Sequence, residues 1–157
     1  MSIKLFRIDD RLIHGQVVVG WGQPLHVGFI VLVDDAVRAS PVEQELYRMG
    51  VPPHIDVIFA SLAEAVAQLP EWDADPRPGI VLAGDIATLA ALTENCHRVT
   101  RINVGGIHAR PGRSERLRFV FLSDAEVEQL QRLAARGVEV TAQDVPTARP
   151  VPLAEFT

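Results

Sequence analysis

Short apolar runs alternate along the chain with segments in which apolar residues recur at helical spacing. The runs cover residues 3–8, 27–33, 55–60, 79–83, 99–104, 117–122 and 138–142. Several are apolar at nearly every position, which is typical of strands covered on both faces, as in a parallel sheet flanked by helices. The pattern therefore predicts strands over these runs and helices between most of them.

Capping signals mark where the predicted helices begin. The pattern Ser-x-x-Glu, in which each side chain can bond the backbone N–H of the other residue, starts at Ser40, Ser61 and Ser123. Asp85 can cap a further helix over residues 86–92. A left-handed glycine often closes a helix, and we expect this at Gly50 and Gly137.

This order of elements predicts a single α/β domain over residues 1–157. Its central sheet should be mainly parallel, with helices on both faces. The tail over residues 144–157 contains three prolines, and we expect it to run over the surface. In such sheets chemistry sits at the carboxyl ends of the strands, which selects the loops after Ile8, Val33, Ala60, Ala83 and Val104.

Composition narrows the class of protein. The chain is 48% hydrophobic and 22% charged, so it can bury a core. It has no apolar run near the ~18–20 residues that span a bilayer, and acidic residues stand near its start, where a signal peptide would be apolar. A single cysteine excludes an internal disulfide. We therefore expect a soluble cytoplasmic protein.

The net charge of −5 argues against general affinity for nucleic acid, but the charge is unevenly spread. Residues 97–118 include six arginines and one acidic residue, Glu115. One interpretation is a solvated surface stretch. The other is a surface that meets phosphate or an acidic partner protein.

The loop after the first predicted strand is more polar than a strand-to-helix turn requires. A neutral imidazole at His14 is a nucleophile near pH 7, and an adjacent carboxylate can fix its tautomer. Arginine side chains and a glycine at the start of a helix favour the close approach of an anion. This combination suits phosphoryl transfer, with candidate residues Arg7, Asp9, Asp10, Arg11, His14 and Gly15.

Simpler interpretations of the same loop stay open. A histidine at a helix start is often a surface or capping residue, Asp9-Asp10 is an ordinary turn pair, and the arginines can simply pair with these aspartates. The chain contains no glycine-rich nucleotide loop, no metal-ligand spacing and no serine-nucleophile motif. We accordingly expect neither a metal nor a cofactor.

A longer motif includes this loop. The string R-I-D-D-R-L-I-H-G-Q-V, followed by V-V-G-W, resembles the signature of IIB domains in the mannose/fructose/sorbose family of the sugar phosphotransferase system (PTS). Residues 30–36, 102–107 and 137–140 with Val145-Pro146 resemble further parts of that family in the same order. The resemblance covers nearly the whole chain, although A-G-D-I at residues 83–86 departs from the turn usual in the family.

The resemblance implies that His14 accepts a phosphoryl group from a IIA phosphohistidine. It also implies transfer to a sugar presented by a membrane IIC/IID permease, with which the chain can associate peripherally. Residues that align with the active-site loop are Asp10, Arg11, Gly15 and Gln16, and Arg11 is the best candidate for holding the phosphoryl group. Asp34 or Asp35 can approach from the second loop.

Two other functions remain open at this point. One is a regulatory phospho-relay protein of the same family that is not coupled to sugar transport. The other is an unrelated α/β protein that binds a nucleotide or another anion.

A second histidine lies in a phosphocarrier-like string. Residues 106–112, G-I-H-A-R-P-G, resemble the phosphorylation motif of HPr, the small histidine phosphocarrier. The context differs, because His108 is followed by R-S-E-R and a strand rather than by an apolar helix. We interpret His108 as a neutral loop residue or, with Arg110, as a secondary phosphate contact. The Gly105-Gly106 turn at the same strand end is expected to face the His14 loop.

Overall fold

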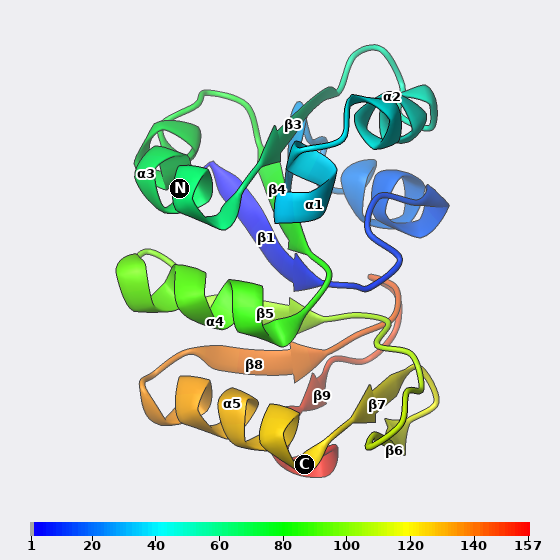
Figure 1. Cartoon of the computed structure of the whole chain (residues 1–157), viewed down its shortest axis with the longest axis vertical. Helices are drawn as coiled ribbons and strands as arrows, with labels where there is room; N and C mark the ends of the chain where they lie inside the picture. The colour runs from blue at the N-terminus through cyan, green and yellow to red at the C-terminus, as the bar shows by residue number, and fades with distance from the viewer. Residues whose placement is uncertain (1) are drawn as a thin grey trace.

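A seven-stranded sheet forms the centre of the computed structural model, which describes residues 2–157 (Figure 1). Its strand order is β3-β2-β4-β1-β5-β8-β9. All neighbouring strands are parallel except β8 and β9, which are antiparallel. The strands are β1 (Ile3–Ile8), β2 (Phe29–Val33), β3 (Asp56–Ala60), β4 (Gly79–Ala83), β5 (Arg101–Val104), β8 (Glu139–Ala142) and β9 (Val151–Pro152).

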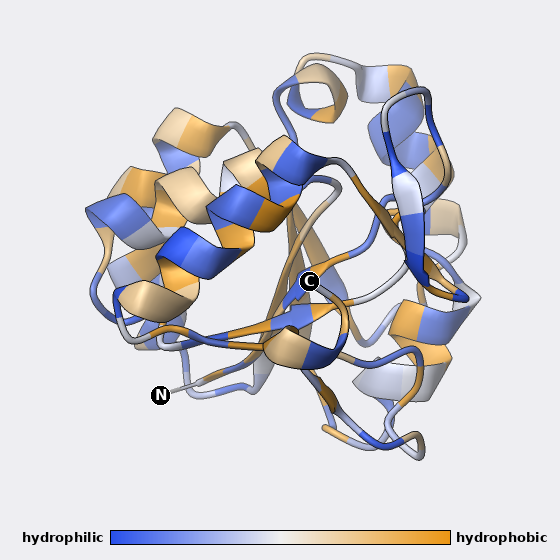
Figure 2. Ribbon diagram, turned by 90° about the horizontal axis from the view of Figure 1, so that it is seen from below, coloured by the Kyte–Doolittle hydropathy of each residue, from blue (hydrophilic) through white to orange (hydrophobic). Residues whose placement is uncertain are grey.

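Helices cover both faces of this sheet. One face packs against α3 (Leu62–Asp73), α4 (Ile86–Asn95) and α5 (Asp124–Ala135). The other packs against the π-helix η1 (Gln16–Gly22), α1 (Asp35–Arg38) and α2 (Pro41–Met49). The central strands carry much of the hydrophobic colour in Figure 2, whereas the helices mix both colours. This architecture confirms the predicted α/β fold with a mainly parallel sheet.

The capping predictions are confirmed except at Ser40 and Gly50. Ser40 caps α2 through the N–H of Glu43 at 3.3 Å, but no return bond from the Glu43 side chain completes the box. Ser61 and Ser123 form reciprocal capping boxes, and Asp85 caps α4 through the N–H of Thr88. Gly137 is left-handed, with φ of +93°. Gly50 is not, because its φ is −89° and its N–H bonds back to Tyr47 in a tightened last turn.

The strand predicted over residues 117–122 is wrong. The segment contains a turn at residues 118–119, which separates β6 (Ser114–Leu117) from β7 (Val120–Leu122). These two strands form a separate antiparallel hairpin outside the main sheet. The hairpin is joined to the end of β5 through an isolated bridge between Ile107 and Val120.

The prediction that the tail runs over the surface is correct only in part, since most of residues 144–157 are exposed or half-buried but Phe156 is buried. Residues 151–152 add the edge strand β9, and the short 3-10 helix η2 (Leu153–Glu155) follows it. The Phe156 side chain enters the core and is only 2% exposed, so an apolar contact anchors the tail despite its prolines. Within residues 2–157, no helix combines the length and the apolar character that crossing a membrane requires.

Candidate functional site

The loop over residues 9–15 lies between the carboxyl ends of the two strands that flank β1. The N–H of Asp9 donates to Ala83 at the end of β4, and the N–H of Asp10 donates to Gly106 beyond β5, each at 2.9 Å. Leu12 adopts a left-handed φ of +60°, which is uncommon for a residue with a Cβ. A Cβ at Gly84 would lie 2.8 Å from the Leu12 side chain, so the small residue in the A-G-D-I turn makes room for this loop.

His14 presents its two ring nitrogens to different environments. Nδ1 lies 3.2 Å from the backbone nitrogen of Gln16 and accepts its N–H at the start of η1. Nε2 is buried and lies 3.4 Å from Oδ2 of Asp9, a separation longer than a well-formed hydrogen bond. An accepting Nδ1 places the ring proton on Nε2, facing the Asp9 carboxylate. The side chain as a whole is 19% exposed, so it is reachable from solvent.

Asp9 is completely buried among positive groups. Oδ1 accepts the backbone N–H and the Nε–H of Arg11, while Oδ2 accepts from Arg11 at 2.8 Å and from Arg7 at 3.2 Å. Burial alone would raise the pKa of Asp9, but the facing Nε2–H of His14, the hydrogen bonds from Arg11 and the charges of both arginines outweigh it. The pKa of Asp9 is therefore held well below its usual range, and the carboxylate is ionised at neutral pH.

Arg7 lies beneath the loop and is fully buried. Its terminal nitrogens donate to the side chain of Asn103, the carbonyls of Gln143 and Asp144, and Asp9. Its guanidinium also stacks 4.9 Å from the Trp21 ring. Burial lowers the pKa of Arg7, and the nearby Asp9 carboxylate acts against that shift. Because its terminal nitrogens are engaged inside the protein, Arg7 is placed to orient Asp9 rather than to contact a phosphate.

Arg11 lies at the mouth of the site, where its side chain is 31% exposed. Besides Asp9, it donates to the Gln16 side chain at 2.7 Å and lies 3.8 Å from the Asp144 carboxylate. The hydrogen bond to Asp9 is the main reason that the pKa of Arg11 is raised. Arg11 and His14 thus both face the Asp9 carboxylate, and Gln16 contacts both of them, His14 through its backbone N–H and Arg11 through its side chain.

Three of the remaining predicted residues, Asp10, Gly106 and Arg110, lie on or beside the His14 loop. Asp10 accepts the backbone N–H of His108 at 2.7 Å and lies 2.5 Å from Nδ1 of the same residue. Gly106 lies against Arg11, which puts the glycine turn beside the His14 loop as the strand order predicts. Arg110 is exposed on the same segment.

Asp34 and Asp35 belong to a different part of the sheet edge. Asp34 caps α1 through the N–H of Val37, and Asp35 accepts the backbone N–H of Leu62 at the start of α3. Both aspartates follow β2, which β4 separates from β1. Their hydrogen bonds therefore stabilise helix starts and do not join them to the His14 loop.

Some residues that support the site were not singled out from the sequence. Asn103 and Gln143 bond each other at 3.3 Å and hold Arg7, and the Asp144 carbonyl accepts from both Arg7 and Trp21. The sequence did contain a signal for them, because Asn103 lies inside an apolar strand and Gln143 directly follows one. A polar side chain buried at such a position needs a hydrogen-bond partner. Which partner they take depends on the pairing of β5 with β8.

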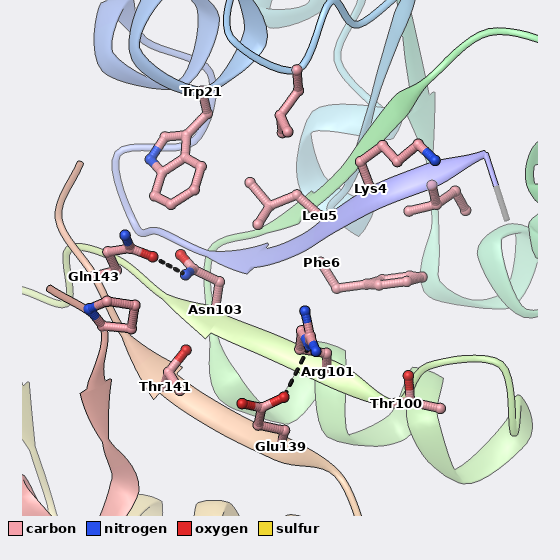
Figure 3. A pocket seen from close by; sticks show the side chains of 13 residues that line it. Lys4, Leu5, Phe6, Trp21, Thr100, Arg101, Asn103, Glu139, Thr141 and Gln143 are labelled. Atoms are coloured by element: carbon pink, nitrogen blue, oxygen red, sulfur yellow. Dashed lines mark hydrogen bonds and ion pairs between the residues drawn. The ribbon is translucent and has the colours of Figure 1, made fainter. Parts of the chain in front are cut away.

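A cavity of about 540 Å³ lies on the sheet face beside η1 rather than at the His14 loop. Figure 3 shows Trp21 and Leu5 on one side of it and the Asn103–Gln143 pair on another. Farther along the strands, Arg101 and Glu139 pair at 2.9 Å. Arg7 connects the two regions, because it contacts Trp21 and Asn103 on the cavity side and Asp9 on the loop side.

The fold and this histidine loop define an α/β domain of the kind found in PTS IIB proteins. A family model described as "PTS system sorbose subfamily IIB component" matches residues 3–157. The chain therefore belongs to this family.

Relatives and solved structures agree with this assignment. The chain is 32% identical over 152 residues to an N-acetylgalactosamine-specific phosphotransferase enzyme IIB component 2 from Escherichia coli, covering 97% of this chain and 96% of that protein. It is 31% identical over 147 residues to the mannose-specific EIIAB component of Escherichia coli, covering 94% of this chain but only 46% of that relative's length. The IIBSor domain of the sorbose permease from Klebsiella pneumoniae superposes with a TM-score of 0.89 at 28% identity, over 99% of this chain and 96% of that one.

Proposed function

We propose that this protein carries a phosphoryl group on His14, taken from the phosphohistidine of a IIA protein or domain. It then passes the group to a sugar presented by a membrane IIC/IID permease. The observation that carries the proposal is the environment of one imidazole: the ionised Asp9 carboxylate lies beside Nε2, the Gln16 N–H donates to Nδ1, and Arg11 bonds to both of these residues. The same proposal implies that the protein works on the cytoplasmic side of the membrane.

The geometry supports Nδ1 as the accepting atom. The Nδ1 lone pair attacks phosphorus, the new Nδ1–P bond forms, and the N–P bond of the donor breaks. The proton stays on Nε2, so the phosphorylated ring carries a positive charge, and the Asp9 carboxylate beside Nε2–H stabilises that charge. In the second transfer a sugar hydroxyl attacks phosphorus, the Nδ1–P bond breaks and the hydroxyl proton is released.

Two neighbouring groups are placed to stabilise the transferred phosphoryl group. The Gln16 N–H that donates to Nδ1 in the free protein can turn to a phosphoryl oxygen once Nδ1 is occupied. Arg11 is held at the mouth of the site by Asp9 and Gln16, where a forked guanidinium matches phosphate oxygens. Fixed donors of this kind stabilise a transferring phosphoryl group without reorganising.

We propose that the permease, rather than this chain, selects the sugar. Relatives carry names that refer to mannose, N-acetylgalactosamine and sorbose, although each of them matches between 89% and 97% of this chain. The variation points to the permease as the part that distinguishes between sugars.

The proposal is tested by labelling the chain with a radioactive phosphorylated IIA protein. The intact chain should acquire an acid-labile, alkali-stable label, and His14→Ala should acquire none. His108→Ala is the matched control, because His108 also lies beside an aspartate of this loop and should still be labelled at completion. A folded His14→Ala variant that keeps the label would overturn the assignment.

A further inference from the structure

The positive charge of residues 97–118 is only partly neutralised in the fold. Four of the six arginines in this stretch pair with carboxylates: Arg98 with Asp73, Arg101 with Glu139, Arg113 with Glu126 and Arg116 with Asp124. Among residues 2–157, Arg110 and Arg118 have neither an ion pair nor a side-chain hydrogen bond, and both are exposed. They stand out in a chain whose net charge is −5.

These two arginines lie near His108, next to the proposed phosphoryl site. The N–H of Ile107 donates to Phe119 and the N–H of Phe121 donates to Ile107, so the turn that contains Arg118 is tied to the start of the His108 segment. On the other side of His108, the backbone N–H of Arg113 donates to the carbonyl of Arg110 and closes a turn. In Figure 1 the β6–β7 hairpin lies on the side of the molecule toward which the arrowheads of β1, β5 and β8 point. We call Arg110 and Arg118 the basic rim.

The backbone beneath the rim is fixed although its side chains are exposed. The His108 side chain is 67% exposed, but its N–H donates to Asp10 and its carbonyl accepts from Arg113 at 2.8 Å. Arg113 is itself held by two bonds to Glu126, the residue that completes the capping box of α5. A surface that is ordered before binding loses less entropy when a partner arrives.

We propose that the basic rim is the docking surface for an acidic face of the phosphorylated donor protein. The inference rests on the proposed function, since the donor is identified by the phosphoryl group that it brings to His14. That group is an anion, and cations beside the acceptor raise the rate at which an anionic partner reaches it.

Other occupants fit the rim less well. Nucleic acid and anionic membranes favour broad basic surfaces, whereas this rim has two arginines, with Glu115 and Asp124 on or beside the same hairpin. The net charge of −5 would also repel an extended polyanion. A protein with one acidic face is the occupant of matching size and charge.

The test measures transfer from a phosphorylated IIA protein by rapid quenching, over a range of donor concentrations. In the double variant Arg110→Glu with Arg118→Glu, we expect the second-order rate constant to fall about tenfold. The rate at saturating donor should stay within about twofold, because the rim guides the encounter and does not act on the bond that breaks. The intact chain should lose rate as ionic strength rises from ~0.01 M to ~0.15 M, and the double variant should respond less.

Arg132→Glu is the matched control. Arg132 is exposed on α5 and, within residues 2–157, has no side-chain partner. Arg132→Glu therefore changes the net charge by the same amount as each rim substitution, but away from the rim. Equal second-order rate constants for the double variant, Arg132→Glu and the intact chain would overturn the docking surface. A fall confined to the saturating rate would do the same.

Failure of the proposed function gives a different result. In that case the intact chain takes no label, or His14→Ala keeps it, whatever the rim variants do. Within residues 2–157 the Arg110 and Arg118 side chains have no hydrogen bond or ion pair to lose, so the double variant and Arg132→Glu should both melt close to the intact chain.

Discussion

At the scale of single residues, the arrangement of the site depends on Asp9. Its two oxygens fix the guanidinium groups of Arg7 and Arg11, and one of them faces Nε2 of His14. A buried carboxylate with these neighbours stays ionised, because its protonation would leave two arginines without their counter-charge. The protonation state of this one group thus determines the geometry of the site.

The role of the ionised Asp9 carboxylate should be visible in how stability depends on pH when the carboxylate is replaced. Asp9→Asn should lower the free energy of unfolding by about 3 kcal/mol at neutral pH, since it breaks a buried ion pair. The folded-state pKa of Asp9 is depressed, so its contribution is complete above the unfolded value of about 3.9 and is lost as pH falls further toward the folded value.

Chemical denaturation of both proteins over a pH series is the measurement. The difference between them should shrink below about pH 4. A difference that stays constant, or that grows in acid, would contradict the account of Asp9. His26→Ala offers a comparison at a histidine outside this network.

The sequence motif pointed to the loop of His14, and the family resemblance favoured Arg11 for holding the phosphoryl group, but the burial of Arg7 could not be predicted from the sequence. Arg7 and Arg11 look alike in sequence, as forked donors near aspartates. Strand β1 buries Arg7 against β5 and β8, whereas Arg11 stays at the surface. The left-handed Leu12 could not be foreseen either, because neither glycine nor asparagine marks that position.

At the scale of elements, the turn after β5 closes the site from below. A Cβ at Gly105 would overlap the Arg7 guanidinium and lie 2.7 Å from Oδ2 of Asp9. Arg7 cannot move aside, because its terminal nitrogens are bonded to β5 and to the residues after β8. The turn therefore needs a residue without a side chain at this position for reasons of space.

Gly105→Ala should lower the free energy of unfolding by about 2–3 kcal/mol, the usual cost of overpacking a fixed region. It should also slow phosphoryl transfer, because Asp9 and His14 shift with Arg7. Denaturation curves and the transfer assay measure the two effects. Gly20→Ala in η1 is the control, since nothing lies within 4 Å of the added Cβ. Equal stability of the two variants would show that the turn has room to adapt.

Elements with local signals were predicted well, and elements without them were not. The serine boxes and Asp85 mark helix starts through bonds within one turn of chain, so the sequence alone locates them. The turn at residues 118–119 contains neither glycine nor proline, which is why 117–122 resembled a single strand. The position of the tail depends on Phe156 reaching a core that other segments build.

At the scale of the whole molecule, the parallel sheet gathers the chemistry at one edge. The His14 loop, the glycine turn after β5 and the basic rim all follow strands whose carboxyl ends lie together. The alternation of apolar strands and capped helices predicts this edge. The uneven charge of residues 97–118 left two interpretations open, and pairing in the fold separates the neutralised arginines from Arg110 and Arg118.

The most direct test of the account is to identify the phosphorylated atom in the whole protein. The chain is labelled with isotopic nitrogen in its histidines, phosphorylated by a IIA protein and observed by heteronuclear NMR. We predict phosphorus coupling to Nδ1 of His14, with Nε2 still bearing its proton toward Asp9. Coupling to Nε2 of His14, or to any nitrogen of another histidine, would contradict the proposed site.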